Sequence, residues 1–467
     1  MKLPRLLAST IALCPLAGMG EVPAADPWHE RARAMLEHLV NVPTVVGRDR
    51  VPELAQWLAD QYRAAGFADA DIHVMPYDNT AALIVRWRAS GTPKARPFML
   101  MAHMDVVEAK REDWTQSDPF VFTQRDGYYY GRGTIDIKQG IVATTMALFR
   151  LRAEGFEPSR DILVFYSGDE ETVEHGAQLG ATKWHELLDA EFGLNSDAGG
   201  GEYRTNGSVI GFKLQSAEKT YADYTFTVRN RGGHSSEPRP DNAIYTLAHA
   251  LERLEAWRFE PALNEITRAY FSAREKHEAG PLGAAMRAWV ADPADGQAAD
   301  FIEANPTTVG STRTRCVATR LMAGHADNAL PQLATAQVNC RILPGVSPDA
   351  IRDELERVVA DPQVKVTRND RYTSSPASPL RSDVLEAYTA AVHALHPDAP
   401  IYPEMSAYAT DGAPFRIAGL PVYGVDGTWM VIPTDRRAHG QDERLPVKAL
   451  DDDVEHWALM VRKLAGG

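Results

Sequence analysis

The sequence has little cysteine and no excess of basic charge. Only three of its 467 residues are cysteine, and they form no thiolate zinc pattern, so a bound metal would need His, Asp and Glu ligands. The formal net charge of −14 argues against nucleic acid and anionic membrane surfaces as partners. With 44% hydrophobic residues and no internal repeat, the composition is that of a globular protein of two or more domains.

Residues 1–25 have the pattern of a secretory signal peptide. Lys2 and Arg5 precede an apolar run from Leu6 to Ala17, and small residues follow up to a cleavage point near Ala24. The apolar run is too short for a membrane span. We therefore expect a leader, rather than a buried N-terminal helix, on a soluble protein that is exported across the inner membrane to the periplasm.

The predicted export determines which cysteines remain in the mature protein and whether they can be oxidised. Cys14 lies within the leader, so only Cys316 and Cys340 remain in the mature chain. In an oxidising compartment they could form one disulfide, but two buried thiols fit the sequence equally well.

Strands and helices alternate over residues 26–215 and again over 374–467, which predicts a mixed, mostly parallel sheet with helices on both faces. Residues 216–373 differ, because their expected order is βαββαβ, the pattern of a small two-layer domain inserted into the larger one. A helical stretch, residues 261–304, interrupts it, and we expect this stretch to affect how the inserted domain dimerises. Helices are expected over 28–40, 51–65, 140–153, 241–257, 347–359, 382–395 and 447–464, and strands over 72–74, 82–87, 97–102, 161–167, 221–228, 316–322, 334–343, 364–368 and 420–425.

The strand from Asp161 to Ser167 leads into the first group of candidate site residues. It is apolar and ends in Gly168-Asp169-Glu170-Glu171. A solvated acidic turn is the commoner fate of such a triplet, but adjacent carboxylates at the mouth of a buried strand repel each other and favour a bound cation.

Other polar residues also follow apolar or aromatic runs, where α/β sheets place their sites. Each alone has an ordinary explanation: a surface pair for His103 and Asp105, a helix cap for Asp136, a turn residue for Asp197 and a loop histidine for His439. Together, two His and three carboxylates suit a pair of zinc ions that share one bridging carboxylate. Glu170 is then left beside the metals to accept a proton from water.

Seven motifs, in order, cover nearly the whole mature chain: AHMDVV, YGRGTIDIKQG, SGDEE, NSDAGG, RGGHSSEP, DNALPQLATAQVNCRILPG and HGQDERLP. With these motifs the chain resembles the zinc metallopeptidase family that includes acetylornithine deacetylase, succinyl-diaminopimelate desuccinylase, glutamate carboxypeptidase, aminoacylase and carboxypeptidase S. The resemblance implies two zinc ions, although Co²⁺ or Mn²⁺ could replace them. It implies His103, Asp136 and Asp197 as ligands of one ion, and Asp136, Glu171 and His439 as ligands of the other.

The resemblance also implies catalytic roles, with Glu170 as general base and Asp105 as the partner that orients His103. The inserted domain would be a lid and dimerisation domain that supplies His234 to the oxyanion, in this family often from the partner subunit. The substrate carboxylate would be bound by Asn328 and Arg341, and less firmly by Thr410 and Gly412.

Two positions depart from the family pattern. Gln139 stands between Lys138 and Gly140, and Asp442 stands where Asn is common. Neither is an implied ligand, so the departures affect fine geometry and substrate choice.

The sequence therefore predicts a di-zinc hydrolase of a peptide or amide bond next to a free carboxylate, acting on small peptides as a carboxypeptidase or dipeptidase does. An N-acyl-amino-acid deacylase is the alternative. Two other classes fit less well: Ser216-Ala217-Glu218-Lys219 is an SxxK motif, but the SDN and KTG partners of penicillin-binding enzymes are missing. A non-catalytic binding protein should lack a ligand or the base, and neither is missing.

Overall fold

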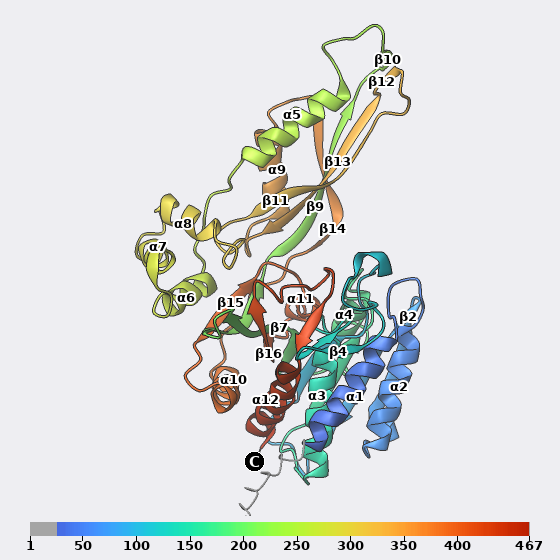
Figure 1. Ribbon diagram of the computed structural model, residues 1–467, viewed down its shortest axis with the longest axis vertical. Coiled ribbons are helices and arrows are strands. Elements are labelled where there is room, and N and C mark those ends of the chain that lie inside the picture. The colour runs from blue at the N-terminus through green and yellow to red at the C-terminus, as the bar shows by residue number, and fades with distance from the viewer. Residues whose placement is uncertain (1–25, 467) are drawn as a thin grey trace, which may run out of the picture.

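The computed structural model describes residues 26–466, and the predicted signal peptide lies outside this range (Figure 1). Among the described residues, no helix combines the length and apolarity needed to cross a membrane. The molecule is elongated, with a larger domain that contains the C-terminus and a smaller domain that extends from it.

The larger domain is built on an eight-stranded sheet in the order β1-β2-β6-β3-β7-β16-β8-β15. Strands β6, β3, β7 and β16 run parallel to one another, as β15 does to β8, whereas β1, β2 and β8 add antiparallel pairs. The strands are β1 (Ile72–Tyr77), β2 (Thr80–Trp87), β3 (Phe98–His103), β6 (Ile162–Ser167), β7 (Phe192–Arg204), β8 (Val209–Glu218), β15 (Ile401–Ser406) and β16 (Val422–Ile432).

Helices cover both faces of this sheet, because its central strands are apolar on both sides. Phe98, Leu100 and Val164 pack under one helical layer, whereas Met99 and Leu163 pack under the other. The first layer contains α1 (Pro27–Asn41), α2 (Val51–Ala64), α3 (Lys138–Ala153), α10 (Ser382–Leu395) and α12 (Val447–Ala465), and the second contains α4 (His175–Ala181) and α11 (Gly412–Ile417). This arrangement confirms the predicted α/β class.

Short elements complete the domain. A three-stranded sheet in the order β17-β5-β4 links the start and the end of the chain. The short elements are β4 (Thr123–Arg125), β5 (Tyr128–Tyr130), β17 (Arg444–Pro446), η1 (Asp69–Asp71) and η2 (Arg111–Asp113).

The smaller domain has the predicted βαββαβ order. The chain leaves the large sheet at Glu218 and enters the small one at Thr220. Its antiparallel sheet, in the order β11-β13-β9-β14, consists of β9 (Thr220–Arg229), β11 (Arg315–Ala323), β13 (Leu333–Ile342) and β14 (Val364–Thr373), packed on α5 (Ala243–Ala256) and α9 (Pro348–Val359). A two-stranded ribbon, β10 (Gly233–His234) and β12 (Ala329–Leu330), lies at the tip of this domain, away from the large sheet (Figure 1).

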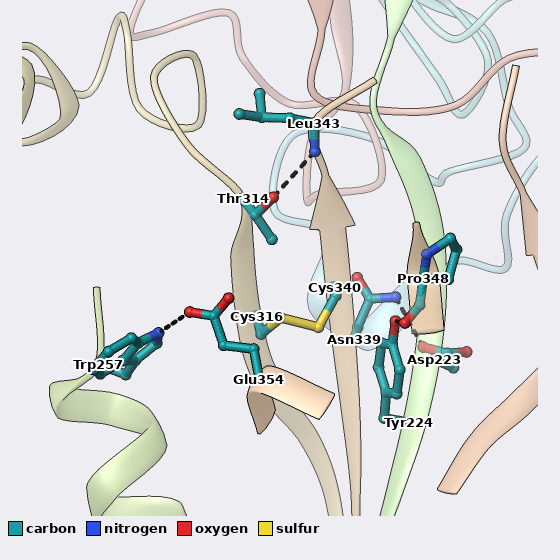
Figure 2. Close-up of a disulfide and its surroundings, with 10 residues drawn as sticks. All are labelled: Asp223, Tyr224, Trp257, Thr314, Cys316, Asn339, Cys340, Leu343, Pro348 and Glu354. Carbon is teal, nitrogen blue, oxygen red and sulfur yellow. Dashed lines mark hydrogen bonds between the residues drawn. A yellow bond between two sulfur atoms is a disulfide. The ribbon is translucent and has the colours of Figure 1, made fainter. Parts of the chain in front are cut away.

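Cys316 and Cys340 form a disulfide (Figure 2). They are directly opposed on the neighbouring strands β11 and β13, and β11 is the exposed edge of the small sheet. Of the two states that the sequence left open, the structure has the disulfide.

The helical insertion forms α6 (Glu265–Arg274), α7 (Gly280–Ala291) and α8 (Gly296–Glu303). It packs against the large sheet at its edge strand β15, where the Tyr270 ring lies 5.8 Å from the Tyr402 ring and Asn264 Nδ2 lies 3.4 Å from Met405 Sδ. The insertion is therefore placed beside the large sheet, close to the junction of the two domains (Figure 1).

Candidate metal centre

The predicted metal ligands converge on one edge of the large sheet. The ligands are His103 at the end of β3, Asp136 in the loop before α3, Glu171 in the turn after β6, Asp197 in strand β7 and His439 in the loop before β17. Parallel strands β3 and β6 have their carboxyl ends at this edge, and β7, which pairs with β3 as far as Asn195, continues past it, so Asp197 lies beside those ends.

Asp136 lies between the two imidazoles. Its Oδ1 is 3.3 Å from His103 Nε2, and its Oδ2 is 3.1 Å from His439 Nε2. Asp197 Oδ1 lies 3.8 Å from His103 Nε2, and Glu171 Oε2 lies 3.0 Å from His439 Nε2. This is the arrangement expected of a bridging carboxylate between two ions, each with its own His and its own acid.

The residues fit a pair of cations. His103 Nε2 is buried without a hydrogen-bond partner and faces three carboxylates. An orphaned ring nitrogen in such a place is costly unless it binds a cation. Two groups of ligand atoms within 4.8 Å of one another lie at this edge, His103 with Asp136 and Glu171, and His103 with Asp197 and Glu170. Both groups share His103, and the second includes Glu170, so the assignment of His439 to the second ion rests on its contacts with Asp136 and Glu171.

The electrostatics of the cluster also favour positive charge. Burial lowers the pKa of His103, but Asp105 and Asp136 outweigh this effect and raise that pKa well above its ordinary value. Hydrogen bonds to Asp136 and Glu171 raise the pKa of His439 to about 10. Burial would raise the pKa of Asp136, yet contacts with both imidazoles hold it below its usual range.

Glu170 lies beside the ligand set, where the sequence predicts the general base. Its Oε2 is 4.0 Å from His103 Nε2, and the side chain is nearly buried. Burial and the charge of Asp197 raise the pKa of Glu170 well above its ordinary value. A carboxylate with increased proton affinity beside a metal centre is suited to accept a proton.

Asp105 supports this centre differently from the expectation. The sequence suggested that its carboxylate orients His103, but the backbone carbonyl of Asp105 takes that contact, 3.0 Å from His103 Nδ1, whereas its Oδ1 is 3.6 Å away. The Asp105 carboxylate instead accepts hydrogen bonds from the backbone N–H groups of Glu170, at 3.1 Å, and Glu171, at 3.0 Å. One residue thus holds both a ligand histidine and the acidic turn.

Sequence reasoning missed Glu443. Its fully buried Oε1 accepts hydrogen bonds from the backbone N–H groups of Gly133, Ile135 and Asp136, and its Oε2 lies 2.5 Å from Arg132 Nη1. Glu443 therefore fixes the loop that carries the bridging Asp136 and ties it to the loop of His439. The Gly-Arg-Gly turn, with a buried cation that needs a partner, was the available signal.

The departure at Asp442 also has a structural reason. Its Oδ1 accepts from the backbone N–H groups of Thr115 and Gln116, and its Oδ2 accepts from Thr115 Oγ1 at 2.7 Å. An asparagine has a single side-chain oxygen, so the carboxylate serves this three-donor arrangement better.

Two of the predicted lid residues lie far from the metal ligands of the same chain. His234 and Asn328 are exposed at the β10–β12 tip, where His234 Nδ1 lies 2.7 Å from Ser236 Oγ. Arg341 is nearer, because its guanidinium stacks 4.7 Å from the Tyr221 ring and interacts electrostatically with Glu170. The oxyanion role of His234 and the substrate-binding roles of Asn328 and Arg341 stay predictions.

Thr410 is fully buried, and its hydroxyl lies 3.1 Å from Glu218 Oε2 and accepts a hydrogen bond from the Gly412 N–H. This position supports the loop between β15 and α11. Neither Thr410 nor Gly412 lines the cavity beside the metal cluster, whereas their neighbours Tyr408 and Ala409 do. Substrate contact by Thr410 and Gly412 stays a prediction.

A cavity of about 560 Å³ opens directly from the ligand cluster. Asp136, Glu170 and His439 are among its lining residues, together with residues of β7, the loop after β15 and the helical insertion. Its size is that of a small-molecule site.

Comparison with known proteins agrees with this geometry. The model of peptidase family M20/M25/M40 matches residues 99–463. Human N-fatty-acyl-amino acid synthase/hydrolase PM20D1 is 28% identical over 78% of this chain and 73% of its own length, and probable carboxypeptidase S-like 2 of Dictyostelium discoideum is 27% identical over 82% and 74%, respectively.

Solved structures share the fold. An M20 family metallo-carboxypeptidase from Sulfolobus solfataricus superimposes with a TM-score of 0.70, at 15% identity, over 93% of this chain and 99% of that one. Human carnosine dipeptidase 1 gives a TM-score of 0.67, at 15% identity, over 94% and 97%. The chain belongs to peptidase family M20/M25/M40, whose members are metallopeptidases and amidohydrolases that act on C–N bonds.

Proposed function

We propose that this protein is an exported, zinc-dependent hydrolase of a peptide or amide bond next to a free carboxylate. The observation that carries the proposal is Asp136 between His103 and His439, with Glu170 alongside and outside the implied ligand set. That arrangement supplies places for two cations and one spare carboxylate.

The metal ions and the side chains around them would have different roles in the reaction. When bound, zinc ions supply Lewis acidity and lower the pKa of water toward neutrality. Glu170 accepts a proton from the attacking water and later delivers it to the leaving nitrogen. Asp105 and Glu443 keep the acidic turn and the Asp136 loop in place through their backbone N–H contacts. Closure of the smaller domain would exclude bulk water, and His234 would reach the developing oxyanion from a second copy of the chain.

Dimerisation through the smaller domain would let His234 reach a site from the partner. Strand β11 is an exposed edge that presents Val317, Leu321 and Met322 to solvent, and α5 presents Ile244 and Tyr245. Exposed apolar residues on an unpaired edge strand favour association with a second copy. We therefore infer a homodimer, which size measurement in solution would test.

An N-acyl-amino-acid hydrolase is the second candidate. It is favoured by the relatives named N-fatty-acyl-amino acid synthase/hydrolase, of which the human protein matches 78% of the chain. Both candidates share one metal centre and one mechanism, and they differ in the group on the acyl side of the scissile bond.

Export to the periplasm is supported by two independent features. The first 25 residues have the composition of a signal peptide, and Cys316 and Cys340 are joined in a disulfide. Analysis of the mature N-terminus after cell fractionation would test this part of the proposal.

The function is tested by a substrate screen. The purified, zinc-loaded protein should hydrolyse dipeptides or N-acyl amino acids that have a free α-carboxylate, and amidation of that carboxylate should abolish turnover. Equal turnover of amidated substrates would remove carboxylate recognition from the proposal, and no turnover of any member would refute the function.

A further inference from the structure

One face of the small sheet carries polar side chains around Arg341. Helices α5 and α9 pack on the other face, where the alternating residues of β9 and β13 are buried and apolar. On the polar face, Tyr221 of β9 lies opposite Arg341 of β13, and Asp223 lies opposite Asn339. All four residues are half-buried, and Tyr221 and Arg341 lie at the end of the two strands that joins the large domain.

The guanidinium of Arg341 lies on an aromatic ring. It is 4.7 Å from the centre of the Tyr221 ring, and no residue that the structure describes accepts a hydrogen bond from it or forms an ion pair with it. Arg315 differs, because it lies directly opposite Arg341 on β11 but is paired with Glu303 at 2.8 Å. A guanidinium stacked on a ring keeps its N–H groups free for a planar anion such as a carboxylate.

The ring beneath Arg341 is itself held in place. The Tyr221 hydroxyl donates to Asp223 Oδ2 at 2.9 Å, and Asn339 Nδ2 donates to Asp223 Oδ1 at 2.8 Å. Figure 2 shows the bond between Asn339 and Asp223, which joins β13 to β9 through side chains. Both oxygens of the Asp223 carboxylate are therefore in use, and together these bonds fix the Tyr221 ring on which Arg341 stacks.

Arg341 also lies within the electrostatic influence of the acidic turn. Glu170 and Glu174, both between β6 and α4, act on its guanidinium together with Asp223. An arginine side chain has many rotamers, and one that is free to move turns toward a nearby carboxylate and pairs with it. Restraint on the Tyr221 ring keeps the guanidinium available to a carboxylate that comes from outside the protein.

We propose that Tyr221 is a positioning residue, which holds the Arg341 guanidinium in the orientation that receives the free carboxylate of the substrate. Asp223 and Asn339 support this role by fixing the ring. The inference rests on the proposed function, in which Arg341 binds that carboxylate. It makes the polar face of the small sheet part of the specificity for substrates with a free carboxylate.

The first test separates substrate binding from turnover. The zinc-loaded enzyme is assayed with a dipeptide and with an N-acetyl amino acid that have a free α-carboxylate. Tyr221→Leu should raise KM about tenfold, the value of a cation–π contact at a partly desolvated site, and change kcat by less than about twofold. Tyr221→Phe keeps the ring and loses only the bond to Asp223, so it should raise KM less than about threefold.

A double-mutant cycle shows whether Tyr221 acts through Arg341. Arg341→Met alone should raise KM at least about tenfold, and addition of Tyr221→Leu to it should raise KM no further. Thr225→Val is the matched control, because Thr225 lies on the same face of β9 and bonds to Gln337, and it should leave KM unchanged. Tyr221 lies on the face opposite the core, so these variants leave the packing of α5 and α9 intact, and thermal unfolding checks this.

The outcomes separate the two proposals. A KM for Tyr221→Leu equal to that of Thr225→Val would overturn the positioning role while leaving the proposed function in place. An equal rise in KM when Tyr221→Leu is added to Arg341→Met would overturn it too, because the ring would then act independently of the guanidinium. A wild-type KM for Arg341→Met would leave nothing to position. Failure of the wild type to hydrolyse either substrate class would overturn the proposed function itself.

Discussion

Replacement of Glu443 by Gln should weaken both zinc binding and folding. The Glu443 carboxylate is fully buried, contacts three backbone N–H groups around Asp136 and neutralises Arg132, whose side chain is 3% exposed. Removal of one partner of a buried ion pair costs roughly 3–5 kcal/mol, because the other charge stays buried. For a domain of this size the unfolding midpoint should fall on the order of 10 °C.

The effect on the metal centre is separate from the effect on stability. Loss of a residue that orients a ligand typically reduces metal affinity about 10- to 100-fold. Competition with a chromophoric chelator measures the zinc affinity of Glu443→Gln, and a thermal scan measures its stability. The double variant Arg132→Met with Glu443→Gln removes both charges, so it should recover stability but not zinc affinity.

Glu443→Gln with wild-type zinc affinity and a wild-type midpoint would refute the argument that this carboxylate positions the Asp136 loop. Recovery of zinc affinity in the double variant would also refute it, because the weakened binding would then reflect only the unpaired Arg132.

Three further predictions follow from other parts of the structure. Glu170→Gln should bind zinc as the wild type does but lower kcat by at least about a thousandfold, since it removes the proton acceptor, and wild-type turnover would exclude that role. Reduction of the Cys316–Cys340 disulfide, whose cysteines are 24 residues apart, should destabilise the smaller domain by roughly 3 kcal/mol. Limited proteolysis with and without reductant measures this effect, and equal protection under both conditions would contradict the prediction. Although burial raises the pKa of Glu202, Lys213 and Arg436 together outweigh this effect and hold it at about 2. The ionised Glu202 therefore contributes folding stability that is complete above about pH 5 and is lost as the pH falls toward 2. The difference in unfolding midpoint between the wild type and Glu202→Gln should shrink over that pH range. A constant difference would contradict this prediction.

Much of the fold could be predicted because its signals are local. The central strands are short apolar runs, and the helices show apolar residues at helical spacing, so the α/β class and the βαββαβ insert are read from periodicity. The ligand set was implied by the resemblance that the motifs carry, and the structure brings all five implied ligands to one place.

Features that depend on pairing between distant segments were not predictable. Residues Gly199–Gly201 look like a loop, yet β7 continues through them to Arg204 because β16 and β8 pair with it on both sides. Cys316 faces Cys340 only in the observed register of β11 and β13. The sequence identifies α6 as a helix, but nothing local says that Tyr270 packs on Tyr402 of the large sheet.

Glu443 shows the same limit at the site. Its contacts join residues 307 to 311 positions apart in the chain, so its role appears only when the two loops are folded together. The sequence correctly predicted that Asp105 contacts His103. It could not show whether the backbone carbonyl or the carboxylate of Asp105 makes that contact.

The central claim is that Asp136 bridges two cations between His103 and His439. Zinc stoichiometry by equilibrium dialysis and metal analysis tests it most directly. The account predicts two zinc ions per chain in the wild type, one in His439→Ala and neither held tightly in Asp136→Ala. A wild-type chain that binds no zinc, or an Asp136→Ala chain that still binds two ions with unchanged affinity, would contradict it.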